Sequence, residues 1–170
     1  MKHTAFSGDA EKAISYKELK ISSSAFSDGG VIPLKYACDG DNISPPLSIA
    51  HVPEQALSLL IVMEDIDAPI RSWTHWLAWN IPVTHHINEG RLHGTQGLND
   101  FGHLHYTGPC PASGTHRYAF RIYALDMVLD MPFHTHKFRL QKEISGHVIA
   151  FGELTGLYTK KEKHFADTMI

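Results

Sequence analysis

The feature of this sequence that most constrains its fold is the recurrence of short apolar runs separated by glycine, proline, asparagine and aspartate. From Leu19 onward these runs follow one another at intervals typical of all-β proteins. The run from Leu57 to Met63 is continuously apolar and too short for an ordinary helix, so it predicts a strand buried on both faces. The run from His75 to Ile81 stops at Pro82, which cannot donate to a strand ladder. The spacing therefore predicts a mainly β protein.

One segment near the C-terminus has helical spacing instead. Between Lys137 and Phe151, apolar residues recur three and four positions apart, at Leu140, Ile144, Val148 and Phe151. We expect a helix there, closed by Gly152, and a short last strand within residues 153–159. The long, histidine-rich segment from Val83 to His105 is predicted to be a functional or mobile loop.

The length of the chain favours a single domain. Its 170 residues suffice for one sizeable hydrophobic core but are short for two. We divide it into an N-terminal extension over residues 1–17, one domain over 18–160 and a C-terminal tail over 161–170. The formal net charge of -3, without clustered lysine and arginine, argues against nucleic-acid binding.

The compartment is predicted from what the sequence lacks. It has no span of about 18 apolar residues, which excludes a transmembrane helix and stable membrane insertion. The first twenty residues lack the apolar stretch of a secretory signal, so we expect a cytoplasmic protein. In that reducing compartment, Cys38 and Cys110 are predicted to be free thiols.

Two segments concentrate polar and aromatic residues beside predicted strands. The first runs over residues 65–76 and contains Asp65, Asp67 and His75, and the second runs over residues 106–118 and contains His116. With the two-residue period of a strand, His75 is predicted to share a face with Leu77, Trp79 and Ile81. By the same rule, His116 shares a face with Tyr118, Phe120, Ile122 and Ala124. Both histidines are therefore expected over the mouth of the core, in one small polar pocket.

Three kinds of site fit two histidines beside two aspartates. In an anion site, a carboxylate bonded to a histidine keeps the imidazole charged, and backbone N–H groups around Gly108 add donors. A metal site needs ligand spacings such as His-Glu-x-x-His, which are absent, although His103 and His105 would share a strand face. A hydrolase needs an activated nucleophile, and prolines on both sides of Cys110 favour a fixed loop instead. The anion site is the preferred interpretation, without metal or cofactor.

Supporting roles follow for the remaining residues of the two segments. Tyr106 and Tyr118 are predicted to line the pocket with a phenol available to the ligand. Arg117 points away from His116 on its strand and is expected to form a buried ion pair with a carboxylate such as Asp67.

At these residues the sequence resembles the phosphatidylethanolamine-binding protein family, also called the Raf kinase inhibitor protein family, in its shorter bacterial and archaeal form. The resemblance covers about Leu19 to Tyr158. Besides the two histidine segments, it rests on several motifs in order along the chain: Asp28 to Pro33, Tyr36 to Leu47, Gly146 to Ala150 and Glu153 to Tyr158.

The resemblance implies a fold, a site and a set of partners. The fold is a large antiparallel sheet packed with a smaller sheet, with few peripheral helices. The implied ligand-binding residues are Asp65, His75, Gly108, His116 and Tyr118, supported by Asp67, Pro69, Trp73, Tyr106, Pro109 and Arg117. Ile66 and Ala112 stand where the family usually has proline, so ligand preference is less well defined than the fold.

The expected function is non-enzymatic binding of phosphate, phosphorylated head groups or similar small anions. In this interpretation the protein acts as an inhibitor or scaffold of a kinase or protease. Assembly into a homodimer is a further expectation. The alternative is a small hydrolase or metal-dependent enzyme that uses the same histidine and aspartate side chains.

Overall fold

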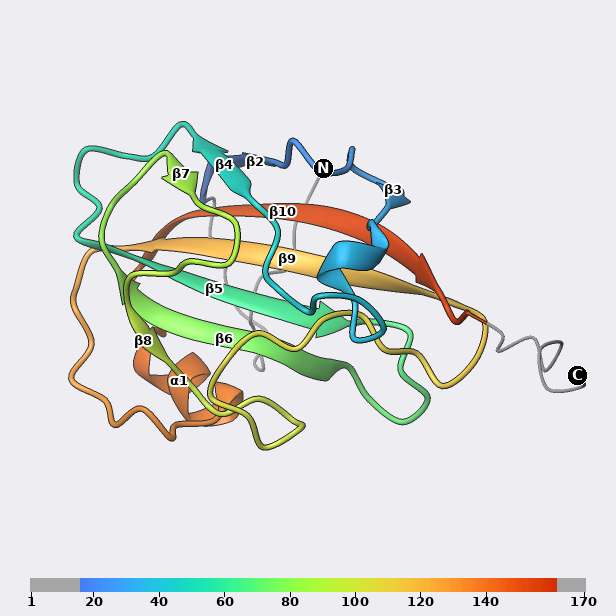
Figure 1. Cartoon of the computed structure of the whole chain (residues 1–170). Helices are drawn as coiled ribbons and strands as arrows, with labels where there is room; N and C mark the ends of the chain where they lie inside the picture. Colours follow the sequence, from blue (N-terminus) through green and yellow to red (C-terminus); the bar gives the residue numbers. More distant parts are fainter. Residues whose placement is uncertain (1–15, 162–170) are drawn as a thin grey trace, which may run out of the picture.

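The computed structural model describes residues 16–161, which form two β-sheets and one α-helix (Figure 1). The predicted extension 1–17 and tail 161–170 lie almost wholly outside the described residues. The large sheet contains β1 (Lys17–Glu18), β3 (Gly30–Val31), β5 (Ser58–Asp65), β6 (Trp73–Ile81), β8 (Thr95–Gln96), β9 (Thr115–Leu125) and β10 (Val148–Thr159). The small sheet contains β2 (Lys20–Ser22), β4 (Leu47–Ala50) and β7 (His86–Ile87). The chain also forms a short 3₁₀-helix, η1 (Leu34–Tyr36), and α1 (Lys137–Glu143).

The predicted mainly β fold with a large and a small sheet is confirmed, and the large sheet is mixed. Its strands follow the order β1-β10-β9-β5-β6-β8. The central pairs β10–β9, β9–β5 and β5–β6 are antiparallel, whereas β1 and β3 both pair in parallel with β10. Every residue of β5 is buried, as its continuous apolar run predicts.

Two hydrophobic cores lie on opposite faces of the large sheet. The first fills the space between the two sheets and includes Ile49 of β4 and Phe120 of β9. The second lies under α1 and joins Leu140 and Ile144 to Leu60 of β5. Figure 1 shows α1 on the side of the sheet away from β2 and β4. The sheet between these cores holds the ends of its central strands in fixed positions.

An irregularity in β6 changes which of its residues share a face. The register with β5 shifts by one residue beside His75, as in a β-bulge. The expected common face of His75 with Leu77 and Trp79 is therefore wrong. Those two residues pack in the core under α1, whereas the His75 ring contacts Tyr118, which belongs to the core between the sheets. The β9 expectation is correct, because Tyr118 and Phe120 share that core.

The predicted helix from Lys137 to Phe151 is also wrong in its second half. Helix α1 ends at Glu143, and Val148 begins β10, which pairs with β9 along its whole length. Leu140 and Ile144 have the helical spacing because they bury one face of α1. Val148 and Phe151 continue that spacing by coincidence, since pairing with β9 decides their conformation. Gly146, with φ of 82°, makes the turn between the two elements.

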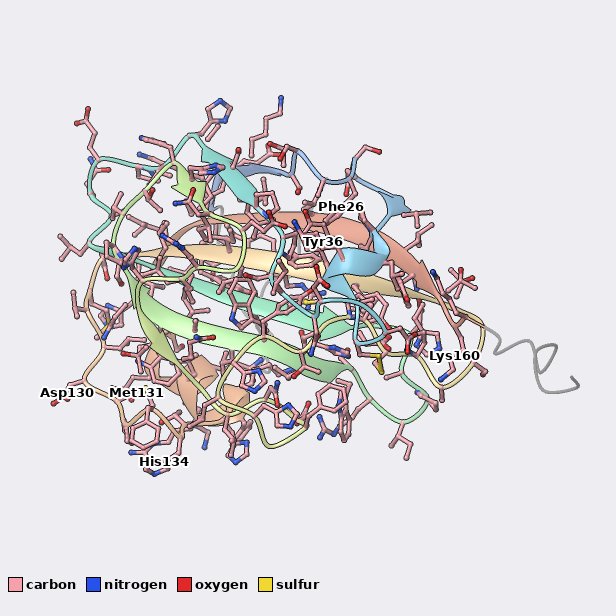
Figure 2. The ribbon with its side chains drawn as sticks, viewed as in Figure 1. Phe26, Tyr36, Asp130, Met131, His134 and Lys160 are labelled. Carbon is pink, nitrogen blue, oxygen red and sulfur yellow. A yellow bond between two sulfur atoms is a disulfide. The ribbon has the colours of Figure 1, made fainter. Side chains whose placement is uncertain are left out.

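The two cysteines form a disulfide, so the expectation of free thiols is wrong. Cys38 and Cys110 have Cα atoms 5.5 Å apart and are 72 residues apart in sequence. The bond is drawn in yellow in Figure 2. Such bonds persist mainly in oxidising compartments, which weighs against the cytoplasmic prediction. Within residues 16–161, no helix has the length and apolar character needed to cross a membrane.

Candidate functional site

The candidate site lies at one end of the large sheet, where β5 ends and both β6 and β9 begin (Figure 1). Asp65, the last residue of β5, is central to it. Its neighbours across the two ladders are Trp73 of β6 and Tyr118 of β9. His75 and His116 lie two residues from these partners, so antiparallel pairing alone brings both predicted segments together.

Asp65 and His116 form a short hydrogen-bonded pair. The Nδ1–H of His116 donates to Oδ2 of Asp65 over 2.7 Å. The other carboxylate oxygen accepts the backbone N–H of Asp67 over 3.0 Å. The Asp65 side chain is 6% exposed and that of His116 is 15% exposed. The histidine is therefore the member of the pair that solvent or a ligand can reach.

His75 is bonded to backbone carbonyls and not to a carboxylate. Its Nδ1 lies 2.8 Å from the carbonyl oxygen of Thr107 and 3.0 Å from that of Gly108. Because a carbonyl only accepts, Nδ1 must carry the hydrogen, which leaves Nε2 as an acceptor in the neutral ring. Burial lowers the pKa of His75, outweighing the two carbonyls and the charge of Asp65. The expected carboxylate partner is therefore present at His116 alone, and His75 is neutral at neutral pH.

The hydroxyl of Tyr118 is buried and lies beside the Asp65 carboxylate and the Cys110 backbone, but it makes no hydrogen bond of good geometry to any described residue. The side chain is completely buried, and its ring meets that of His75 edge to face with centroids 5.3 Å apart. Burial, followed by the charge of Asp65, raises the pKa of Tyr118 far above its usual value. The phenol is therefore a protonated donor that lacks a well-placed acceptor.

Gly108 connects the site to the loop after η1. Its N–H, expected to face an anion, donates instead to Oδ1 of Asn42 over 2.7 Å. A Cβ at this position would overlap the carbonyl oxygen of Tyr36 and lie 2.9 Å from Cα of Ala37. Only glycine fits, because the two loops are in direct backbone contact. The next residue, Pro109, accepts the backbone N–H of Cys38 over 3.1 Å.

Asp67 and Arg117 form the expected ion pair, but on the surface. The guanidinium donates through Nε and Nη2 over 2.9 and 2.8 Å, and the Arg117 backbone N–H adds a third bond. The side chains are 57% exposed for Arg117 and 30% for Asp67, so the pair is not buried as predicted. The bonds from Arg117 lower the pKa of Asp67 to about 2. This pair fixes the rim of the site.

The other predicted supporting residues lie around the site in different ways. Pro69 is exposed in the loop between β5 and β6, and Trp73 is half-buried with the Arg71 guanidinium 5.0 Å from its ring centre. The hydroxyl of Tyr106 donates to the carbonyl of Tyr36 over 2.8 Å. It is therefore not available to a ligand, contrary to the expectation.

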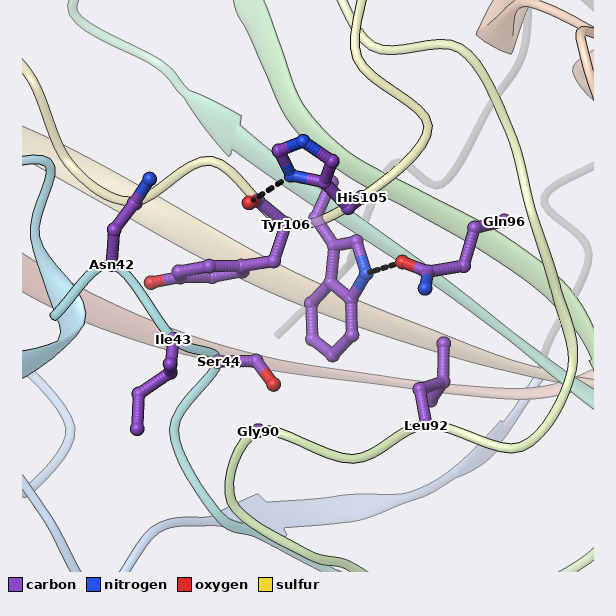
Figure 3. A pocket seen from close by; sticks show the side chains of 9 residues that line it. Asn42, Ile43, Ser44, Gly90, Leu92, Gln96, His105 and Tyr106 are labelled. Carbon is purple, nitrogen blue, oxygen red and sulfur yellow. Dashed lines mark hydrogen bonds between the residues drawn. The ribbon is translucent and has the colours of Figure 1, made fainter.

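Tyr106 lines a separate pocket of about 170 Å³ (Figure 3). Trp76 also lines it, and its indole N–H donates to Oε1 of Gln96 over 3.0 Å. Asp65, His75, His116 and Tyr118 are not among its lining residues. The two tyrosines of the second polar segment thus serve different regions of the molecule.

Two residues of the site have no clear signal in the sequence beyond their turn-rich surroundings. The first is Asn99, which is buried. Its Nδ2 donates to the carbonyl of His75 over 2.9 Å and to Oγ1 of Thr107 over 3.0 Å. Its Oδ1 accepts the backbone N–H groups of Phe101 and His103. The Phe101 ring meets the edge of the His75 ring at 4.9 Å between centroids. Asn99 therefore orders the loop that covers His75, and a functional role for the segment 83–105 stays a prediction.

The geometry also bears on the metal and hydrolase alternatives. In the described part of the chain, no three His, Cys, Asp or Glu side chains are grouped so that they could hold a metal ion. His103 and His105 stack face to face with centroids 4.9 Å apart. Cys110 is in the disulfide and has no thiolate to act as a nucleophile.

The fold and this histidine–aspartate cluster define a two-sheet β protein with a polar site at one end of its large sheet. A family model described as phosphatidylethanolamine-binding protein matches residues 22–159, and the chain belongs to that family. It is 44% identical over 165 residues to a UPF0098 protein of Archaeoglobus fulgidus, covering 91% of this chain and 56% of that protein's length.

Two solved structures share the fold. A phosphatidylethanolamine-binding protein homologue from Chlamydia trachomatis superposes with a TM-score of 0.81 and 42% identity, over 85% of this chain and 99% of that one. YbcL from E. coli, described as a new member of the mammalian family, superposes with a TM-score of 0.77 and 27% identity, over 84% of this chain and 99% of that one.

Proposed function

We propose that this chain binds a small oxyanion without catalysing a reaction, and that the ligand is phosphate or a phosphorylated head group held among Asp65, His75, His116 and Tyr118. The observation that carries the proposal is the buried Tyr118 hydroxyl, which lies beside the Asp65 carboxylate and the Cys110 backbone but makes no well-aligned hydrogen bond within residues 16–161. Such a donor is costly unless something accepts from it. An anionic oxygen at this position would satisfy it.

The protonation of the site favours a ligand that carries one proton of its own. Neutral His75 presents an acceptor at Nε2, whereas Tyr118 presents a donor. His116, when it carries both protons, adds a charged donor at Nε2, because its Nδ1–H is committed to Asp65. A phosphate monoanion complements all three, since its P–OH donates to His75 and its other oxygens accept. A dianion would lack that donor and would be repelled more strongly by Asp65.

The family supports the same class of ligand. Its description names the phospholipid phosphatidylethanolamine, whose head group contains a phosphate. We extend this to the chemical class only. Two further proposals rest on the resemblance alone: a role as inhibitor or scaffold of a kinase or protease, and assembly as a homodimer. The inhibitor or scaffold role would follow from binding a phosphorylated partner.

Calorimetric titration with inorganic phosphate at pH 6.5 tests the proposal. We expect Tyr118→Phe to weaken binding about three- to tenfold, the range for one hydrogen bond. Its stability should be unchanged or higher, because the variant removes an unsatisfied buried hydroxyl. His116→Ala should weaken binding more, by about tenfold or more, because a charge-assisted bond is lost.

The chain offers a matched control. His147 also bonds to an aspartate, with Nδ1 2.8 Å from Oδ1 of Asp126, but both side chains are more than 40% exposed at the other end of β9 and β10. His147→Ala should bind phosphate like the natural chain. Equal affinities for the Tyr118, His116 and His147 variants would contradict the proposed site, and absence of phosphate and phosphoethanolamine binding would contradict the proposed ligand class.

A further inference from the structure

The loop that fixes His75 is itself attached at successive points to the segment that begins at the last residue of η1. The hydroxyl of Tyr106 and the N–H of Gly108 both donate to that segment, to the Tyr36 carbonyl over 2.8 Å and to Asn42 over 2.7 Å. The backbone N–H of Cys38 then donates back to Pro109 over 3.1 Å. The Cys38–Cys110 disulfide closes this series of contacts. One covalent bond therefore lies in the contact that holds the Thr107 and Gly108 carbonyls against His75.

The two loops joined by this bond lie outside the sheets. Cys38 is in the connection between η1 and β4, and Cys110 is in the connection between β8 and β9. Apart from the disulfide, these loops are joined by single hydrogen bonds and by the close backbone packing of Gly108 on Tyr36 and Ala37. Breaking the bond would leave β5, β6 and β9 paired while freeing the loops to separate. The prolines on either side of Cys110 stiffen its loop, so that displacement at Cys110 would be transmitted to Gly108.

The disulfide is accessible from solvent. Cys110 is an exposed residue and Cys38 is half-buried, so the bond lies at the surface, where we expect a small thiol to reach it. Exposed disulfides exchange with thiols more readily than buried ones. This accessibility distinguishes the bond from a staple enclosed within the core.

We propose that the Cys38–Cys110 disulfide is a redox switch for the candidate site, which orders the loop of Gly108 and fixes the His75 ring when oxidised and releases both when reduced. The reductant is a dithiol. One of its thiolates attacks a sulfur of the bond and forms a mixed disulfide while the other cysteine leaves as a thiolate. The second thiol of the reductant then displaces the first cysteine. Overall, Cys38 and Cys110 gain two electrons and two protons, and the dithiol becomes a disulfide.

The consequence for ligand binding rests on the proposed function, whereas the consequence for His75 does not. With the loop released, Nδ1 of His75 loses its two fixed carbonyl acceptors, and Nε2 is no longer constrained to face the site. We therefore expect phosphate affinity to fall about three- to tenfold on reduction, the range for one hydrogen bond.

The experiment compares the oxidised full chain with the same chain reduced by dithiothreitol. Alkylation by iodoacetamide, read by mass spectrometry, should modify no cysteine in the first and two in the second. Imidazole ¹⁵N shifts of His75 and hydrogen exchange of the Gly108 amide are then measured without ligand, and phosphate affinity is measured by titration. We expect reduction to move the His75 shifts, accelerate Gly108 exchange and weaken phosphate binding, while the amide signals of β5 and β9 stay dispersed.

A double variant separates loss of the bond from other effects of the reductant. Cys38→Ser with Cys110→Ser should resemble the reduced chain with and without dithiothreitol. If the double variant does not fold, the reduced natural chain still decides the question. His75 shifts that do not move on reduction would overturn the switch, as would unfolding of β5 and β9, which would make the bond a structural staple. If the oxidised chain fails to bind phosphate, the proposed function falls, and the His75 shifts decide the switch separately.

Discussion

Gly108→Ala tests the close contact between the two loops most severely. The added methyl group would overlap the Tyr36 carbonyl oxygen and lie 2.9 Å from Cα of Ala37, inside the ordinary contact distance of about 3.5 Å. Overpacking of this kind costs about 1–3 kcal/mol. The loop must also move away from Asn42, which loses a hydrogen bond worth about 1 kcal/mol. The expected loss in the free energy of unfolding is therefore about 2–4 kcal/mol.

Urea unfolding followed by tryptophan fluorescence measures this loss. Gly102→Ala is the control, because a Cβ there has no atom within 4 Å and the variant suffers only the strain of φ at 77°. That strain costs about 1 kcal/mol. For a chain of this length, a loss of about 3 kcal/mol lowers the melting temperature by roughly 6–12 °C. If Gly108→Ala unfolds at the same urea concentration as the natural chain, the loops are not in the contact described above.

Further predictions concern pH and the loop over His75. The pKa of Asp67 is about 2, below that of the unfolded chain. Its pair with Arg117 therefore contributes stability above about pH 4 that is lost as pH falls toward 2. In Asp67→Asn, the free energy of unfolding should change less with pH over that interval. Burial lowers the pKa of His75, so the unfolded chain binds the proton more tightly and stability should fall as pH drops below about 6.5. Urea titrations at pH 7.5 and 5 should show a smaller loss in the free energy of unfolding for His75→Gln than for the natural chain. Asn99→Ala leaves the amides of Phe101 and His103 without their acceptor and should destabilise the chain by about 2–4 kcal/mol in thermal unfolding. Phosphoethanolamine affinity should fall between pH 6 and 9 in calorimetry, because the ligand loses its P–OH proton near pH 6, and a rising affinity would contradict an acceptor at His75.

The sequence predicted the central strands because burial leaves a local pattern in them. The continuous apolar run of β5 and the alternation in β9 follow directly from packing on one or both faces. These strands also bring Asp65, His116 and Tyr118 together, so part of the site could be located from the residue pattern alone. The helix prediction failed after Glu143 because the pairing of β10 with β9 overrides a spacing that happens to continue.

The remaining features depend on contacts between distant parts of the chain. The β-bulge that turns His75 toward Tyr118 arises from the register between β5 and β6, and no residue type in this part of the sequence predicts it. The disulfide joins residues 72 positions apart, and its prediction failed because it was inferred from the expected compartment. The partners of His75 are backbone carbonyls, which any sequence could supply, so its neutral state becomes visible only when burial and geometry are known.

A crystal structure of the oxidised chain grown with phosphoethanolamine would show directly whether this cluster holds a phosphate group. We predict one phosphate oxygen about 2.5–3.0 Å from the Tyr118 hydroxyl and another about 2.7–3.2 Å from Nε2 of His75. The Asp65–His116 bond should remain in place beside it. A phosphate bound elsewhere, with the Tyr118 hydroxyl still lacking an acceptor, would contradict the assignment of this cluster as the anion site.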